Sequence, residues 1–347
     1  MKTKKTNSST YSEQANVVPM KVTDKLSEQT TMKKTEPSLP KHFLKMKSIP
    51  LPLEAIDLRD FVRIKIPQLE PLLGEWLLPQ GLVMIHGPRG KGKTHLAFGI
   101  GCAVASGQNF LGWNCSTPKK VVYLDGEMSA RMLQSRVKKL PKRMRPKSGY
   151  FKLVTPDFQQ GLLPDLSSRE EHENINAAIA DDVDLIIVDN LSCWSKSGRE
   201  DADTWAPIAE WALAHRTAGR TVIFVHHSGK AGTQRGTSRR EDLLDVVLGL
   251  KSPPNASPAD GAYFEIHFEK NRHLVGADVN PISARLVPNA EGKHHWVWDK
   301  VNRNTNERMA KINKLKAKGM NQSEIAQELR VNRSTVSRDL KAQEAKE

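Results

Sequence analysis

The sequence predicts an α/β protein with a mostly parallel sheet, followed by a small all-α domain. From about Leu51, short apolar runs rich in Val, Ile and Leu alternate with longer amphipathic stretches. A glycine-rich segment follows the first of these runs directly, and a helical stretch follows the segment. Beyond Asp299 the sequence becomes polar and helical. Alternating strands and helices place helices on both faces of a parallel sheet, so we expect one large core and a C-terminal appendage.

Each apolar run is short enough to be one strand, and each amphipathic stretch is long enough to be one helix. We expect strands at Leu82–His86, Val121–Leu124, Phe151–Val154, Leu185–Val188, Thr221–Val225, Val246–Leu250 and Tyr263–Phe268. We expect helices at Thr94–Ser106, Ala130–Leu140, Glu170–Ala180 and Thr204–Thr217.

The charge of the chain points to a polyanionic partner. Its 347 residues include 53 Lys and Arg against 39 Asp and Glu, a formal charge of +14, which makes nucleic acid the first expected partner. Residues 1–50 hold ten lysines and four acidic residues, without apolar periodicity. We expect a disordered basic tail there, and both a solubilising leader and a transient phosphate contact are compatible with it.

Composition excludes several classes of protein. No apolar run reaches the roughly 18 residues of a membrane helix, and the N-terminus is charged where a signal peptide would be apolar. Cys102, Cys115 and Cys193 are far apart and form no CxxC pair, so neither a disulfide framework nor a zinc site is indicated. We therefore expect a cytoplasmic protein with no membrane partner.

The glycine-rich segment has the spacing of a phosphate-binding loop. Residues 87–94 read GPRGKGKT, which satisfies GxxxxGK[ST] between a strand and a helix. Backbone N–H groups of such a loop surround a triphosphate, Lys93 reaches the β- and γ-phosphates, and the Thr94 hydroxyl coordinates magnesium. The expected ligands are therefore ATP and Mg²⁺. The expected nucleotide-binding residues of the loop are Gly87, Pro88, Arg89, Gly90, Lys91, Gly92, Lys93 and Thr94.

A second carboxylate for the metal is expected from a neighbouring buried strand. Asp189 follows four consecutive aliphatic residues and so emerges at the carboxyl edge of the sheet, as a Walker B residue does. The next residue is Asn190, so no base stands beside the Walker B acid. Asp125 and Glu127, after the second strand, are both candidate bases, and both could instead cap the following helix.

Taken together and in order, these motifs resemble the RecA-like ATPases of the plasmid RepA and replicative DnaB helicase group. The resemblance runs from about Leu69 to Val287, through VVYLDGEMS, LIIVDNLS, TVIFVHHSGK and FEKNRH. It implies a RecA-like P-loop core and favours Glu127 over Asp125 as the catalytic base. It also implies a polar sensor at His226 or His227, of which we take His226, and an adenine-contacting arginine at Arg136.

The same resemblance implies that the protein is a homo-oligomer, a hexameric ring. Lys270 and Arg272 occupy the place from which that family sends an arginine finger into the neighbouring subunit. The loop GTQRGTSRRED, with Lys230, Arg235, Arg239 and Arg240, is basic, and a DNA contact and a solvated loop are both compatible with it.

Residues 307–347 resemble the helix-turn-helix of resolvases and sigma-like regulators. Three helical stretches share one apolar set, and Arg330 stands in the turn where glycine is usual. At 100° per residue, Val336 and Leu340 of the last helix face inward. The opposite face is expected to bind DNA through Ser334, Ser337, Arg338 and Lys341.

The sequence thus predicts three parts: a basic tail at 1–50, an ATPase domain at 51–300 and a helix-turn-helix domain at 307–347. The function we expect is that of an ATP-dependent DNA-binding motor, a replicative helicase of a plasmid, phage or other mobile element. An ATP-switched regulator of transcription or replication, and an accessory factor of another helicase, are the alternatives.

Overall fold

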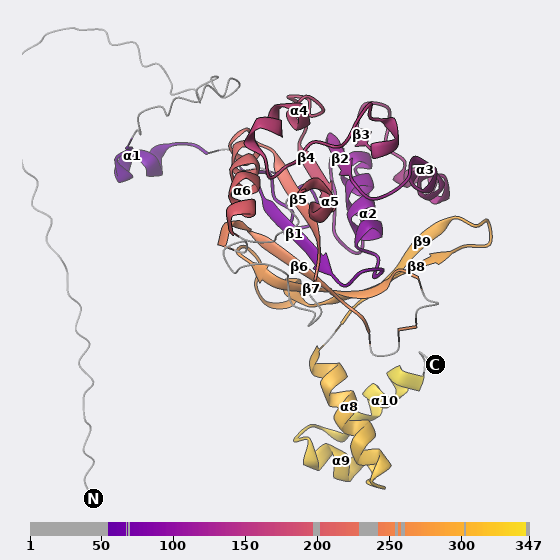
Figure 1. Cartoon of the computed structure of the whole chain (residues 1–347). Helices are drawn as coiled ribbons and strands as arrows, with labels where there is room; N and C mark the ends of the chain where they lie inside the picture. The colour runs from indigo at the N-terminus through magenta and orange to yellow at the C-terminus, as the bar shows by residue number, and fades with distance from the viewer. Residues whose placement is uncertain are drawn as a thin grey trace, which may run out of the picture. The chain divides into compact units, whose positions relative to one another are not determined.

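The computed structural model describes residues 55–66, 68, 70–196, 202–228, 242–253, 256–257, 261–301 and 303–344 (Figure 1). The expected basic tail at 1–50 lies outside the described residues. So does the basic loop with Lys230, Arg235, Arg239 and Arg240. Within the described ranges, no helix is long and apolar enough to cross a membrane.

Described strands join in one mixed sheet of order β3-β2-β4-β5-β1-β6-β7-β8-β9. Neighbours from β3 to β6 run parallel, and β7, β8 and β9 are added antiparallel at one side. The strands are β1 Leu82–Gly87, β2 Val121–Asp125, β3 Phe151–Val154, β4 Leu185–Asp189, β5 Thr221–His227, β6 Val246–Lys251, β7 Tyr263–Asn271, β8 Ile282–Pro288 and β9 His294–Lys300. The expected α/β fold with a mostly parallel sheet is confirmed.

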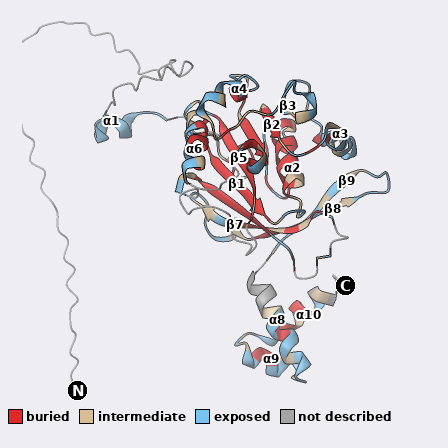
Figure 2. Cartoon of the chain, viewed as in Figure 1, coloured by how far each residue is buried: buried red, intermediate tan, exposed pale blue. Residues whose placement is uncertain are grey.

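Helices cover both faces of the parallel part of the sheet (Figures 1 and 2). The α-helices up to β5 are α1 Leu58–Arg63, α2 Lys93–Ser106, α3 Ala130–Lys139, α4 His172–Asn176, α5 Leu191–Trp194 and α6 Ala202–Thr217. Single 3-10 turns lie at Lys142–Met144, Pro156–Phe158, Arg169–Glu171 and Gly276–Val279.

The core follows from the alternation of side chains along fully buried strands. In β4, Leu185 and Ile187 pack in the cluster that contains α2, and Ile186 and Val188 pack in the cluster that contains α6. Gly99 lets α2 lie close to its surroundings, because a Cβ there would come within 2.5 Å of the Phe110 ring. The site-bearing strands are therefore held from both sides.

The expected strands and most expected helices are present, with bounds shifted by a few residues. The predicted range of the helix at Glu170–Ala180 is wrong. A 3-10 turn leads into the short α4, which ends at Asn176. The Asn176 side chain accepts hydrogen bonds from Trp211 and His215 of α6, so tertiary contacts occupy the end of α4. Helix α1 was not expected and exposes its apolar residues.

The C-terminal helices form a separate apolar cluster. They are α8 Arg303–Ala317, α9 Gln322–Glu328 and α10 Arg333–Glu344, and the buried residues of the cluster are Ile312, Ile325, Ala326, Val336 and Leu340. Asn321 and Glu324 make a capping box at the start of α9. Arg330 has φ +52° in the turn after α9, which explains why glycine suits that position. Arg308 pairs with the buried Asp339 at 2.6 Å and ties α8 to α10.

Candidate active site

Four parallel strands deliver their last residues to one edge of the sheet. The register places Asp125 of β2 beside Asp189 of β4, and Gly87 of β1 beside His227 of β5. The loop between β1 and α2 lies at this edge, where open α/β sheets bind ligands. A cavity of about 390 Å³ opens here, and its lining residues are Gly90, Gly92, Lys93, Thr94, His95, Glu127, Met128, Met132, Arg136, Asp189, His227, Gly261 and Ala262.

The loop depends on two glycines with left-handed backbone conformations, Gly90 at φ +73° and Gly92 at φ +88°. A Cβ on Gly92 would also lie 2.9 Å from Ala262 and from the Phe264 ring, so only glycine fits. Lys93 and Thr94, in the first turn of α2, line the cavity with both glycines. The other four loop residues do not line it, and these are Gly87, Pro88, Arg89 and Lys91.

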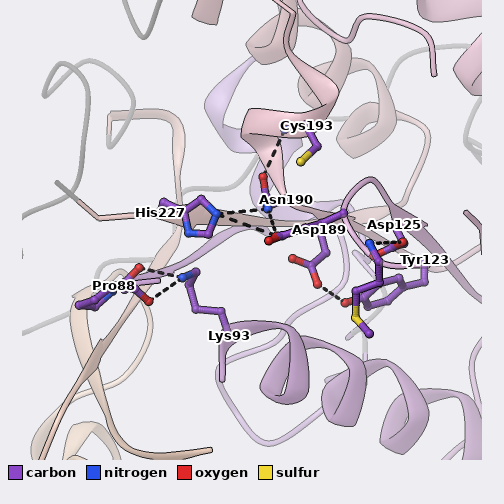
Figure 3. Close-up of polar contacts among 11 residues, drawn as sticks. Pro88, Lys93, Tyr123, Asp125, Asp189, Asn190, Cys193 and His227 are labelled. Carbon is purple, nitrogen blue, oxygen red and sulfur yellow. Dashed lines mark hydrogen bonds and ion pairs between the residues drawn. The ribbon is translucent and has the colours of Figure 1, made fainter. Parts of the chain in front are cut away.

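Lys93 is buried and folded back on its own loop. Its Nζ donates hydrogen bonds to the carbonyl oxygens of Gly87 at 2.9 Å and Pro88 at 2.8 Å (Figure 3). Burial lowers the pKa of Lys93 to about 8, and the charges of Asp189 and Glu127 oppose that shift. The ammonium group is thus held by two neutral carbonyl acceptors, which a negatively charged phosphate could replace.

Asp189 and Thr94 have the donor atoms that magnesium prefers. Asp189 is 1% exposed, and its Oδ2 accepts a hydrogen bond of 2.5 Å from the Tyr123 hydroxyl (Figure 3). Burial raises its pKa, and the hydroxyls of Tyr123 and Thr94 act in the opposite direction. Its Oδ1 is buried without a hydrogen-bond partner among the described residues. A carboxylate oxygen and a hydroxyl at the start of a phosphate-binding helix fit Mg²⁺, which keeps several water and phosphate ligands.

The two candidate bases occupy different environments. Asp125 is fully buried, accepts a hydrogen bond from the Met128 N–H at 3.1 Å and does not line the cavity. Burial raises the pKa of Asp125 to about 7. The Glu127 side chain is 54% exposed and lines the cavity with Lys93 and Thr94. Of these two acids, Glu127 is the one whose side chain reaches the cavity.

His227, and not the expected His226, lines the cavity. Side chains alternate along β5, so the two histidines face opposite ways. His226 is 1% exposed and does not line the cavity. His227 Nε2 lies 4.0 Å from Glu127 Oε2 and 3.3 Å from the Asn190 amide nitrogen (Figure 3). The sequence alone could not distinguish the two histidines, because it does not show which face of β5 borders the cavity.

Arg136 lines the end of the cavity formed by α3. Its Nη1 is buried and has no hydrogen-bond partner in the described part of the chain. A ligand in the cavity could therefore accept a hydrogen bond from it. Burial lowers its pKa, and the charges of Tyr123 and Asp189 act in the opposite direction. His95, which sequence reasoning missed, also lines the cavity, and burial lowers its pKa to about 4, so its imidazole is neutral. Its position directly after Thr94 was the available signal.

Lys270 and Arg272 lie away from this cavity. Lys270 pairs with Val247, and Arg272 N donates to Asp245 O, at the amino end of β6. Because Val246 pairs with Val83 near the start of the parallel β1, this is the sheet edge opposite the phosphate loop. Arg272 donates to the Asp242 carbonyl at 2.6 Å and pairs with Asp245 at 3.5 Å. The length of the strands thus separates Arg272 from the phosphate loop of its own chain.

The expected DNA-binding residues lie on α10 of the C-terminal cluster. Ser334, Arg338 and Lys341 are exposed, and Ser337 is half-buried. Val336 and Leu340 are buried on the opposite side of the helix, as the helical period predicts. The exposed face therefore carries hydroxyl and cationic groups.

The pKa of Lys93 predicts proton uptake on nucleotide binding. Lys93 is mostly neutral at pH 9 in the free protein, and a bound triphosphate restores its charge, so about one proton is taken up per ATP at pH 9 and far less at pH 7. Isothermal calorimetry in two buffers of different ionisation enthalpy measures the uptake. Equal proton uptake at both pH values would contradict the conclusion that burial lowers the pKa of Lys93 to about 8.

Comparison with known proteins identifies the family of the chain. The family model described as "AAA domain" matches residues 49–233. No curated protein matches the sequence. Among solved structures, the crystal structure of the RadB recombinase is similar, with a TM-score of 0.42 and 18% identity over 65% of this chain and 92% of that chain. Because the family match covers more than half of the 347 residues, this chain belongs to the AAA domain family of P-loop ATPases.

Proposed function

We propose that this protein is an ATP-hydrolysing, DNA-binding motor that serves as a replicative helicase of a plasmid, phage or other mobile element. One observation carries the hydrolytic part: the Glu127 carboxylate opens into the same cavity as Lys93, Thr94 and Asp189. A phosphate-binding loop without a base would support binding alone. A carboxylate that reaches the cavity supports hydrolysis as well.

In the proposed reaction, backbone N–H groups of the loop and the start of α2 bind the phosphates of ATP. Lys93 exchanges the Gly87 and Pro88 carbonyls for the β- and γ-phosphates and neutralises their charge. Thr94 and Asp189 would hold Mg²⁺, which supplies positive charge to the phosphate oxygens. Glu127 orients the attacking water and accepts its proton. Arg136 contacts the nucleotide from α3.

We further propose that Arg272, with Lys270, completes the site of a neighbouring subunit. The register supports this, because Arg272 lies at the edge of the sheet opposite its own phosphate loop. An arginine supplied across an interface stabilises transition-state charge and makes hydrolysis depend on assembly. A homo-oligomeric ring, a hexamer, is the proposed assembly.

DNA is the proposed polymer substrate. The formal charge of +14 favours a polyanion, and the exposed face of α10 carries Arg338 and Lys341 beside the Ser334 hydroxyl. We propose that α9 and α10 act as a helix-turn-helix with α10 as the recognition helix. The left-handed turn at Arg330 and the capping box at Asn321 support that assignment.

Exchange of each candidate acid for its amide separates their roles. We expect Glu127→Gln to bind Mg-ATP and to hydrolyse it at least about a hundredfold more slowly, because the general base is lost. We expect Asp125→Asn to lose less than about tenfold, because Asp125 has a pKa of about 7 and is largely neutral at slightly acidic pH already. Steady-state phosphate release and fluorescent-nucleotide binding measure both. An active Glu127→Gln beside an inactive Asp125→Asn would reverse the assignment.

Mixing two inactive variants tests whether Arg272 acts on a neighbour. We expect Arg272→Ala to bind ATP normally and to hydrolyse it at least about a hundredfold more slowly. In a mixture with Glu127→Gln, some interfaces pair an intact Glu127 with an intact Arg272. Random mixing of equal amounts should restore up to about a quarter of the parent rate. Arg285→Ala, which removes a cation from the adjacent strand β8, is the matched control and should keep the parent rate.

An inactive mixture, with mixed oligomers shown by native mass spectrometry, would contradict the proposed role of Arg272. Hydrolysis by Arg272→Ala at the parent rate would contradict it equally. Either outcome would favour the ATP-switched regulator.

Removal of residues 305–347 should leave DNA-stimulated ATP hydrolysis largely intact and abolish sequence preference on duplex DNA. In the full chain, Arg338→Ala should weaken specific binding by about 1–3 kcal/mol if Arg338 contacts a base, or lower the salt slope by about one if it contacts phosphate. Lys318→Ala, an exposed cation at the end of α8, is the control. Unchanged duplex binding by the truncated chain would indicate that the C-terminal helices contact protein and not DNA.

Unwinding of forked DNA by the full chain tests the helicase proposal itself. Failure to unwind it would favour the ATP-switched regulator.

A further inference from the structure

Asn190, the residue directly after Asp189, has a side chain that joins three elements of the site. It is 1% exposed. Its Oδ1 accepts a hydrogen bond from Cys193 N at 3.2 Å and caps the start of α5. Its Nδ2 donates a hydrogen bond to Glu127 Oε2 and lies 3.3 Å from His227 Nε2 (Figure 3). The amide therefore contacts α5, the segment after β2 and the end of β5 at once.

The contact with α5 determines which way the amide points. A backbone N–H can only donate, so the group facing Cys193 N must be the carbonyl oxygen of Asn190. The NH₂ group must then face Glu127 and His227, with one hydrogen available for each. When His227 Nε2 accepts this hydrogen, the imidazole carries its proton on Nδ1.

The backbone leading to Glu127 is bound to the same segment. Gly126 N donates to the Asp189 carbonyl at 2.7 Å. A Cβ on Gly126 would lie 2.7 Å from Cys193 Cβ, so the turn packs directly on α5. The Glu127 side chain is 54% exposed, and its carboxylate meets the buried amide of Asn190. A half-exposed side chain with several rotatable bonds needs such a contact to keep one orientation.

We propose that Asn190 is a positioning residue for hydrolysis: its amide holds the Glu127 carboxylate toward the attacking water and links it to His227. The proposal rests on the proposed ATPase function. Fixed orientation of a general base raises the turnover number and leaves nucleotide affinity to the phosphate loop. Asn190 therefore supplies, from the Walker B segment, the orientation of a base that comes from another strand.

The first test replaces the amide and keeps the helix cap. In Asn190→Ser, the serine hydroxyl can still accept from Cys193 N, but it is too short to reach Glu127. We expect kcat for ATP to fall at least about tenfold and KM to stay within about threefold. Asn321→Ser makes the same change at the N-cap of α9, where the side chain contacts only backbone N–H groups among its described partners, and should keep the parent values. A kcat of Asn190→Ser within twofold of the parent would overturn the proposal.

A double-mutant cycle tests whether Asn190 acts through Glu127. In a Glu127→Gln background, the residual rate should change less than about twofold on adding Asn190→Ser, because the group being positioned is already gone. A second tenfold fall would show an independent role, such as support of the fold, and would overturn the proposal.

A measurement without turnover separates this proposal from the proposed function. In the full ¹⁵N-labelled protein, the side-chain amide signals of Asn190 are assigned by their loss in Asn190→Ser. We expect these signals to shift in Glu127→Ala and to stay in place in Asn321→Ser. Unmoved signals in Glu127→Ala would overturn the Asn190 contact. If the parent protein hydrolyses no nucleotide, the proposed function fails, and the amide signals alone decide the role of Asn190.

Discussion

The alignment of strand ends at one edge of the sheet is the constraint on which the rest of the site depends. Strands buried on both faces cannot carry charged groups in their middle, so polar residues collect where the strands end. The register then sets Asp125 beside Asp189, and Gly87 beside His227. A shift of one residue in β4 or β5 would turn these side chains to the opposite face.

Burial at that edge gives two carboxyl groups close in sequence different surroundings and different access to the cavity. Asp125 and Glu127 are two residues apart, but one is enclosed with a raised pKa and the other reaches the cavity. Burial also lowers the pKa of Lys93, and the nearby charges of Asp189 and Glu127 partly restore it. The site therefore combines a cation of reduced proton affinity with an accessible carboxylate, an arrangement suited to an anionic ligand whose own charge completes the balance.

The sheet also separates Lys93 from Arg272, the arginine that we propose acts on a neighbouring subunit. Lys93 stands at the carboxyl edge, and Arg272 stands at the other, near the start of β1. The antiparallel strand β7 makes this possible, because it runs back across the sheet from the cavity wall near Phe264 to the opposite edge. The chain therefore has a binding loop at one edge of the sheet and an arginine at the other, and the proposed head-to-tail assembly would bring the two together between neighbouring subunits.

The sequence by itself determined the elements that local rules govern. Short runs of β-branched residues indicated the parallel strands, the GxxxxGK[ST] spacing indicated the loop, and helical period indicated the inward position of Val336 and Leu340. The tertiary structure decided which way side chains point and which distant residues form hydrogen bonds with one another. It turned His227 rather than His226 to the cavity, enclosed Asp125, ended α4 at Asn176 and brought the Asn190 amide to Glu127. The physical reason is that a strand's pattern shows that its two faces differ but not which face meets the ligand, and that hydrogen bonds between distant segments leave no periodic signal in either segment.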